Sequence, residues 1–130
     1  MTAAKGKAQG KVNGFRVKRI YDPTAADDGF RVLVDRLWPR GVAKAKAHID
    51  EWLKDVAPSD ALRRRFHDRP AKWNEFVAAY SRELEQEPAK AAAAGLREKS
   101  QHEPVTLLYA ARDQSHNNAV ALKEWLERHK

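Results

Sequence analysis

Runs of apolar residues predict three strands in this chain. Residues 31–35 (Arg-Val-Leu-Val-Asp) have an apolar middle on successive positions, which suits a strand buried on both faces of a sheet. Residues 105–111 form the strongest strand signal in the chain. Residues 15–20 alternate apolar and basic side chains in part, which is typical of a half-exposed strand. We therefore expect two buried strands and one more exposed strand.

The spacing of apolar residues predicts one long helix clearly and leaves one segment ambiguous. The clear helix covers residues 70–86, with Pro70 in its first turn. Its apolar face consists of Trp73, Phe76, Val77, Tyr80 and Leu84. The ambiguous segment is 44–58, where helical spacing competes with a strand over 50–56. The helical spacing there is that of Ile49, Trp52, Leu53 and Val56.

Three further helices are predicted from the residues that begin them. Ser59 can cap a helix over residues 60–66. Pro88 opens an alanine-rich helix that ends near Lys99. Ser115 can cap the last helix of the chain.

The order of these elements predicts the fold class. Buried strands that are separated by helices imply a parallel pair, because a parallel connection needs a long crossover. The sequence thus predicts an α/β fold, with a small mainly parallel sheet flanked by helices in a single domain over residues 15–130. Residues 1–14 are rich in Gly, Ala, Lys and Gln without periodicity, and we expect a disordered basic tail there.

The composition excludes several kinds of site. The chain contains no cysteine, so disulfides, thiolate metal sites and a cysteine nucleophile are excluded. It has no phosphate-binding glycine loop, no dinucleotide fingerprint and no His-Glu-x-x-His motif, and we expect neither a cofactor nor a metal. No segment reaches the roughly 18 apolar residues of a membrane span. Without the apolar segment of a secretory signal near the start, a cytoplasmic protein with no membrane partner is expected.

A formal net charge of +7 makes a polyanionic partner conceivable. Three positive charges, Lys5, Lys7 and Lys11, lie in the tail, which has no acidic residue. The sharpest basic cluster is Arg63–Arg65. Consecutive residues spread around a helix, so this cluster is typical of a solvated face. The tail and Arg63–Arg65 could alternatively bind nucleic acid.

Polar and aromatic residues follow both buried strands at the end where each strand stops. In open parallel sheets, ligands bind beyond the carboxyl ends of the strands. If the two strands are neighbours, these residues face one crevice. They are Asp35, Arg36, Trp38 and Arg40 after the first strand, and Arg112, Asp113, Ser115, His116 and Asn117 after the second.

This set of residues suits the binding of an anion. Arg36, Arg40 and Arg112 offer forked hydrogen bonds to phosphate or carboxylate oxygens. The amino end of the last helix would add free backbone N–H groups and a positive dipole end. Trp38 can stack on a planar ligand or cover the end of the sheet.

The same ends of the strands hold candidates for acid–base chemistry. His116 can act as a base or a donor, and Asp35 or Asp113 can orient it. Each of these residues also has a structural interpretation, since aspartate at a strand end commonly caps a turn or pairs with an arginine. Asp113 and Ser115 are ordinary turn and cap residues.

Four segments together make a specific combination of motifs. They are 18–22 (Lys-Arg-Ile-Tyr-Asp), 32–41 (Val-Leu-Val-Asp-Arg-Leu-Trp-Pro-Arg-Gly), 52–59 (Trp-Leu-Lys-Asp-Val-Ala-Pro-Ser) and 106–113 (Thr-Leu-Leu-Tyr-Ala-Ala-Arg-Asp), which His116 and Asn117 complete. With this combination, residues 15–127 resemble the YeaO-like family of small bacterial proteins. The resemblance implies an α/β fold, and the function of the family is unknown.

The resemblance has two consequences for the site. The wider superfamily often carries Cys-His-Arg at the start of the last helix, where this chain has Ser115, His116 and Asn117. A thiol-based mechanism is therefore not expected. The family pattern also places residues 52–56 in a strand, which would bring Lys54, Asp55 and Ser59 towards the crevice.

The sequence supports three hypotheses about function. The first is a crevice for an anionic or nucleotide-like small molecule, with or without acid–base catalysis by Asp35 and His116. Its ligand-binding residues would be Arg36, Trp38, Arg40, Lys54, Ser59, Arg112, Asp113 and Asn117. The second is a nucleic-acid-binding accessory protein, and the third is a protein-interaction module. The oligomeric state is left open.

Overall fold

The computed structural model describes residues 14–66 and 69–128 of the chain. Its four strands form one sheet in the order β1-β4-β2-β3, and all neighbouring strands run parallel. The strands are β1 (Phe15–Arg19), β2 (Phe30–Leu33), β3 (Glu51–Trp52) and β4 (Val105–Tyr109). The predicted α/β fold with a mainly parallel sheet is confirmed. The predicted tail falls on residues 1–13, which lie outside the described residues, and on Gly14.

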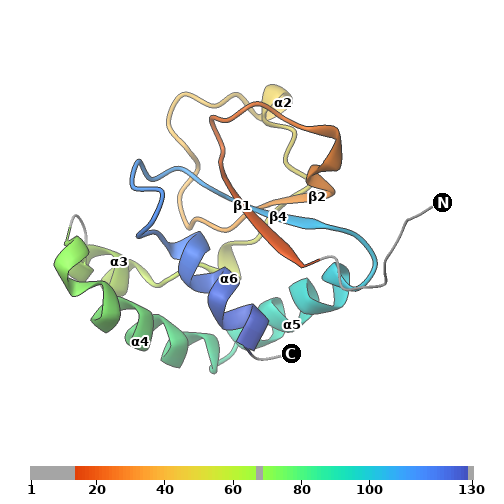
Figure 1. The fold of residues 1–130 in the computed structure, drawn as a ribbon. Helices are drawn as coiled ribbons and strands as arrows, with labels where there is room; N and C mark the ends of the chain where they lie inside the picture. Colours follow the sequence, from red (N-terminus) through yellow and green to blue (C-terminus); the bar gives the residue numbers. More distant parts are fainter. Residues whose placement is uncertain (1–13, 67–68, 129–130) are drawn as a thin grey trace.

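The helices are distributed unequally around the sheet. Figure 1 shows α3, α4, α5 and α6 together on one side, while α2 and the loops after β1 and β2 lie on the other. The α-helices are α2 (Lys44–Ala47), α3 (Asp60–Phe66), α4 (Trp73–Leu84), α5 (Ala89–Ser100) and α6 (Asn118–Arg128). Three short 3-10 helices are η1 (Ala26–Asp28), η2 (Lys54–Val56) and η3 (Pro70–Lys72). None of the helices in the described part of the chain has the length and apolarity to cross a membrane.

The central strands are buried on both faces, as the apolar residues on successive positions at 32–34 and 107–109 predict. On the helix side, Val32 and Leu107 belong to a core that includes residues of α4, α5 and α6. On the other side, Leu33 and Leu108 pack with Ile20, Trp38 and Trp52. Successive residues of one strand thus point into two different cores.

The prediction of a strand over residues 52–56 is wrong. Strand β3 ends at Trp52, and the chain then forms η2, in which the Ala57 N–H donates to the Lys54 carbonyl at 3.0 Å. The buried Tyr80 hydroxyl donates to the Val56 carbonyl at 2.6 Å and holds this turn against α4. A turn stabilised from outside the segment overrides its local strand propensity.

The cap predicted at Ser59 is confirmed. Its Oγ accepts a hydrogen bond from the Leu62 N–H at 3.1 Å, the side-chain cap expected at the start of α3. The Ser59 hydroxyl also donates to Glu83 of α4 at 2.6 Å. Ser59 therefore joins the first turn of α3 to α4.

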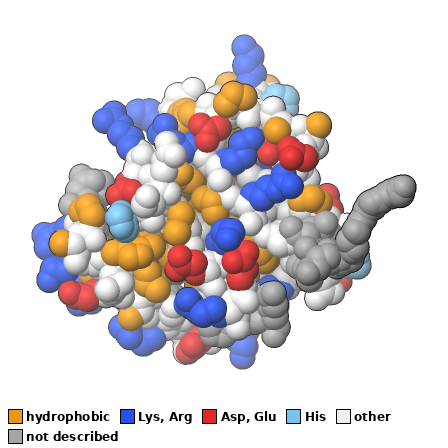
Figure 2. Space-filling view, viewed as in Figure 1, with side chains coloured by type: hydrophobic (Ala, Val, Ile, Leu, Met, Phe, Trp, Pro, Cys, Tyr) orange, Lys and Arg blue, Asp and Glu red, His pale blue; other side chains and the backbone are white. Residues whose placement is uncertain are grey.

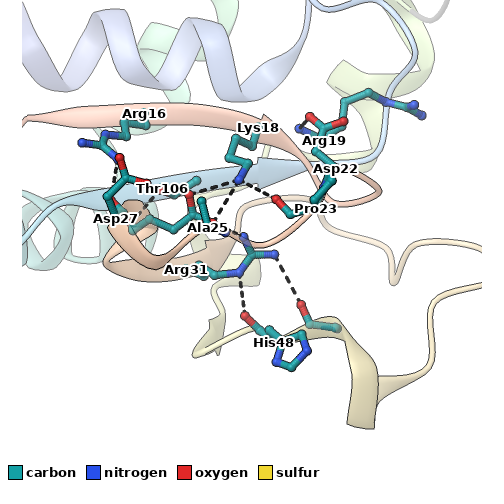
Figure 3. Close-up of polar contacts among 12 residues, drawn as sticks. Arg16, Lys18, Arg19, Asp22, Pro23, Ala25, Asp27, Arg31, His48 and Thr106 are labelled. Carbon is teal, nitrogen blue, oxygen red and sulfur yellow. Dashed lines mark hydrogen bonds and ion pairs between the residues drawn. The ribbon is translucent and has the colours of Figure 1, made fainter.

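A buried cluster of charges lies just before β2 and joins it to β1 and α2. Asp28 is 3% exposed, and its carboxylate accepts hydrogen bonds from Lys18, Arg31 and the Ala25 N–H. Arg31 also donates to the His48 carbonyl at 2.7 Å, as Figure 3 shows. Burial alone would raise the pKa of Asp28, but its hydrogen bonds from Ala25, Lys18 and Arg31 hold it below the ordinary value.

Candidate functional site

A cavity of about 810 Å³ lies at the carboxyl ends of β2 and β4. Figure 2 shows hydrophobic side chains gathered over α3 and α4, with Lys and Arg side chains at the outer border of this region. We call this cavity the crevice. It is lined by Tyr21, Asp35, Leu37, Trp38, Pro39, Arg40, Pro58, Arg63, Phe66, Arg69, Pro70, Trp73, Phe76, Ala110, Ala111, Arg112, Asp113, His116, Asn117 and Asn118.

Most of the predicted site residues meet in the crevice. The loop after β2 contributes Asp35, Trp38 and Arg40, and the loop after β4 contributes Arg112, Asp113, His116 and Asn117. The two loops converge because β2 and β4 are neighbouring parallel strands.

Several residues expected at the crevice lie outside its lining, namely Arg36, Lys54, Asp55, Ser59 and Ser115. Arg36 donates to the carbonyls of Pro58 at 2.9 Å and Ala57 at 3.1 Å, so its guanidinium is used to hold the chain before α3. Ser59 caps α3, and the Lys54 ammonium lies 4.2 Å from the centroid of a Trp52 ring. The placement of Lys54 and Ser59 follows from η2, which turns the chain where a strand was expected.

Aromatic side chains from α3 and α4 form one wall of the crevice. The rings of Trp73 and Phe76 are stacked, with centroids 5.6 Å apart and an interplanar angle of 25°. Phe66 meets Phe76 edge to face at 5.9 Å. This arrangement gives the crevice an apolar, polarizable surface against which a planar ring can pack.

His116 is held between this wall and the loop after β4. Its Nδ1 lies 3.1 Å from a carboxylate oxygen of Asp113, as predicted for an orienting aspartate. Its ring packs edge to face on Trp73, with centroids 5.2 Å apart. The backbone N–H groups of Ser115 and His116 donate to Asp113 and lower the pKa of its carboxyl. Asp113, His116 and Trp73 thus form a continuous contact chain.

Asp35 joins the ends of both central strands to α6. Its carboxylate accepts hydrogen bonds from the Ala110 N–H at 2.9 Å and from the Asn118 amide at 3.0 Å. Burial raises the pKa of Asp35, and the two neutral donors only partly oppose this. In the described part of the chain, Asp35 shares no hydrogen bond with His116, so these two candidates do not form a coupled pair.

The amino end of α6 differs from the prediction. Asn117, not Ser115, is its cap, because the Asn117 side-chain oxygen accepts from the Val120 N–H at 2.9 Å. The N–H groups of Ser115 and His116 are taken by Asp113. The backbone N–H groups of Ser115, His116 and Val120 are therefore satisfied within the protein.

Arginine side chains supply the positive charge of the crevice. Four arginines line it against two aspartates. The guanidinium groups of Arg40 and Arg112 form no hydrogen bond or ion pair with any described residue, and both residues are exposed. Arg63 makes one ion pair with Asp60 at 3.3 Å, and its Nε is buried with no hydrogen-bond partner among the described residues. The crevice thus has cationic donors available for an anion.

The sequence did not predict the wall formed by Phe66, Trp73 and Phe76, nor the presence of Arg69 in the crevice. Arg63 was expected in a separate basic cluster and not in the crevice. Apolar residues on one helix face predict a core, and Phe66 and Trp73 do contact the core as well as the crevice. Pro70, which begins η3 just ahead of Trp73, is the only local signal that this helix starts at an irregular, exposed turn.

Comparison with known proteins identifies relatives over almost the whole chain. A family model described as the inactive DUF488-N3 subclade matches residues 14–130. Uncharacterized protein YeaO of Escherichia coli strain K12 is 41% identical over 109 residues, which cover 84% of this chain and 93% of YeaO.

Two mycobacterial relatives give a similar result. Uncharacterized protein Rv3073c of Mycobacterium tuberculosis strain ATCC 25618 / H37Rv is 40% identical over 111 residues, or 85% of this chain and 92% of its own length. Uncharacterized protein Mb3100c of Mycobacterium bovis strain ATCC BAA-935 / AF2122/97 has the same identity and coverage. No solved structure shows a significant match. The resemblance to the YeaO-like family is confirmed, and the chain belongs to the DUF488-N3 subclade that is described as inactive.

Proposed function

We propose that this protein binds a small anionic ligand with a planar ring, such as a nucleotide, in the crevice. The observation that carries the proposal is the Trp73–Phe76 wall together with Arg40 and Arg112 in one cavity. The guanidinium groups of these two arginines have no partner among the described residues. The volume of about 810 Å³ lies within the roughly 300–1,000 Å³ of small-molecule sites.

The two parts of the crevice suit the two parts of such a ligand. A planar ring gains apolar burial and stacking against the aromatic wall. A phosphate or carboxylate gains forked hydrogen bonds from Arg112 or Arg40. A ligand that has both groups uses both parts of the crevice at once and binds more tightly than either fragment.

Binding without catalysis is the form of this proposal that we favour. The family model that matches the chain is described as an inactive subclade. The Asp35 carboxylate is engaged by Ala110 and Asn118, and Nδ1 of His116 is engaged by Asp113. The contacts of Asp35 give it a structural role, and the contact with Asp113 fixes the orientation of the His116 ring.

Isothermal titration calorimetry with AMP, adenosine and inorganic phosphate tests this proposal. AMP is expected to bind more tightly than adenosine or phosphate. Arg112→Ala should weaken AMP binding by about tenfold, because one charge-assisted hydrogen bond contributes roughly 1.5 kcal/mol or more. The affinity for adenosine should change little in this variant.

Arg82→Ala is the matched control, because Arg82 is an exposed arginine of α4 outside the crevice lining. It removes the same charge from the protein and should leave AMP binding as in the wild type. The proposal fails if AMP binds no better than its fragments, or if the two arginine variants lose the same affinity.

A further inference from the structure

The basic cluster Arg63–Arg65 begins at the crevice and lies on α3. Arg63 lines the crevice directly. The guanidinium carbon of Arg65 lies 5.1 Å from the ring centroid of Phe66, which belongs to the aromatic wall. Arg64 is exposed on the same short helix. The positive charge of the crevice therefore continues onto the surface of α3.

Few acidic side chains balance this charge. Asp60 pairs with Arg63 at 3.3 Å, with both side chains well exposed. Among the described residues, Arg64 and Arg65 have no acidic partner. A partially balanced arginine cluster beside an aromatic wall is a feature of sites that follow a phosphate backbone and stack its bases.

The crevice also has an uncovered apolar rim. Tyr21 is 46% exposed and Leu37 is 56% exposed, and both line the crevice from the loops after β1 and β2. Large apolar side chains that are left open beside a polar rim commonly mark a surface that a partner covers. One free nucleotide that sits against Trp73 does not account for the rim and for the cluster on α3 together.

We infer that the ligand of the crevice is a nucleotide unit within single-stranded nucleic acid, with neighbouring phosphates held by Arg64 and Arg65. This inference rests on the proposed function, since it extends the occupant of the same crevice. A single strand can turn one base onto the aromatic wall, whereas the bases of a duplex are paired and stacked and cannot reach it.

Fluorescence anisotropy with a fluorescein-labelled uridylate dodecamer tests the inference, with unlabelled UMP as competitor. The dodecamer should bind at least about tenfold more tightly than UMP. Its affinity should fall with salt, with a log–log slope of about −0.7 for each phosphate contact. A double-stranded dodecamer should bind more weakly than the single strand.

Three variants of the full chain locate the contacts. The double substitution Arg64→Ala and Arg65→Ala should reduce affinity for the dodecamer about tenfold, and more than for UMP. Trp73→Ala should reduce the affinity for both the dodecamer and UMP. A variant with Lys5→Ala, Lys7→Ala and Lys11→Ala should keep the preference for the dodecamer over UMP. The matched control Arg82→Ala should behave as the wild type.

The outcomes separate this inference from the proposed function. If UMP binds at the crevice and the dodecamer binds no more tightly, the inference is overturned and the proposed function stands. If the dodecamer does not bind, the inference is overturned, and the calorimetry with AMP decides the proposed function by itself. If the three lysine substitutions abolish binding of the dodecamer while Trp73→Ala has no effect, the nucleic acid is bound outside the crevice and the inference is overturned.

Discussion

Two aspartates show how the partner of a carboxylate, and not burial alone, decides its pKa. Burial raises the pKa of Asp35, whose partners are the neutral N–H of Ala110 and amide of Asn118. Asp28 is buried as well, but two cations, Lys18 and Arg31, hold its pKa below the ordinary value. Burial thus disfavours the ionised form of Asp35 at the crevice, whereas the two cations favour the ionised form of Asp28.

Replacing Asp28 by asparagine should strongly destabilise the fold. Asp28→Asn leaves Arg31, whose side chain is 6% exposed, without its anionic partner. The expected loss is about 3 kcal/mol of unfolding free energy, measured by urea denaturation at pH 7. The matched control is Asp27→Asn, whose ion pair with Arg16 is exposed, with an expected change within about 0.5 kcal/mol. Equal losses in the two variants would contradict the account of the cluster.

The comparison of the wild type with Asp28→Asn also gives a pH dependence with a defined sign. The pKa of Asp28 is lowered in the folded protein from 3.8, so its stabilising contribution is present above about pH 4. That contribution is lost as the pH falls through the folded-state pKa. The unfolding free energy of the wild type should therefore decrease more steeply on acidification than that of Asp28→Asn.

Among the elements, β2 and β4 were predictable because each overlaps a short apolar run, at residues 32–34 and 107–111. Strand β3 was not, because its end is decided by the bond from Tyr80 to Val56, which is distant in sequence. The helix caps show the same difference between local and distant causes. Ser59 acts on the helix that directly follows it, whereas the loop before α6 offers several cap residues, and only the folded geometry selects Asn117.

The approach of β2 to β4 depends on Gly29. This glycine has φ +68°, and a Cβ at this position would lie 2.1 Å from the Pro104 carbonyl oxygen. Gly29→Ala should lower the unfolding free energy by clearly more than the roughly 1–2 kcal/mol cost of a left-handed alanine. Gly41→Ala is the control, because Gly41 has φ +77° with no atom within 4 Å of the added Cβ. If both variants lose the same stability by thermal denaturation, the close approach has no energetic effect.

At the scale of the whole molecule, the position of the crevice follows from the sequence, but most of its lining does not. The strand-end residues Asp35 and Arg112 could be placed together because parallel neighbours end at the same edge. The wall at Trp73 could not, because nothing in the spacing of α4 shows that its first turn packs beside the loop after β4. Arg36 was assigned to ligand binding because a sequence does not show which carbonyls an arginine will meet.

The central claim is that the crevice is a ligand site, and an amide NMR titration of the isotope-labelled full chain with AMP tests it most directly. We expect shifts to concentrate at residues 35–41 and 110–118 and at the Trp73 indole N–H, assigned with the variant Trp73→Phe. Shifts at β1 and α5, which contribute nothing to the lining, should stay small. An unchanged spectrum at millimolar AMP, or shifts confined to regions outside the crevice, would contradict the account.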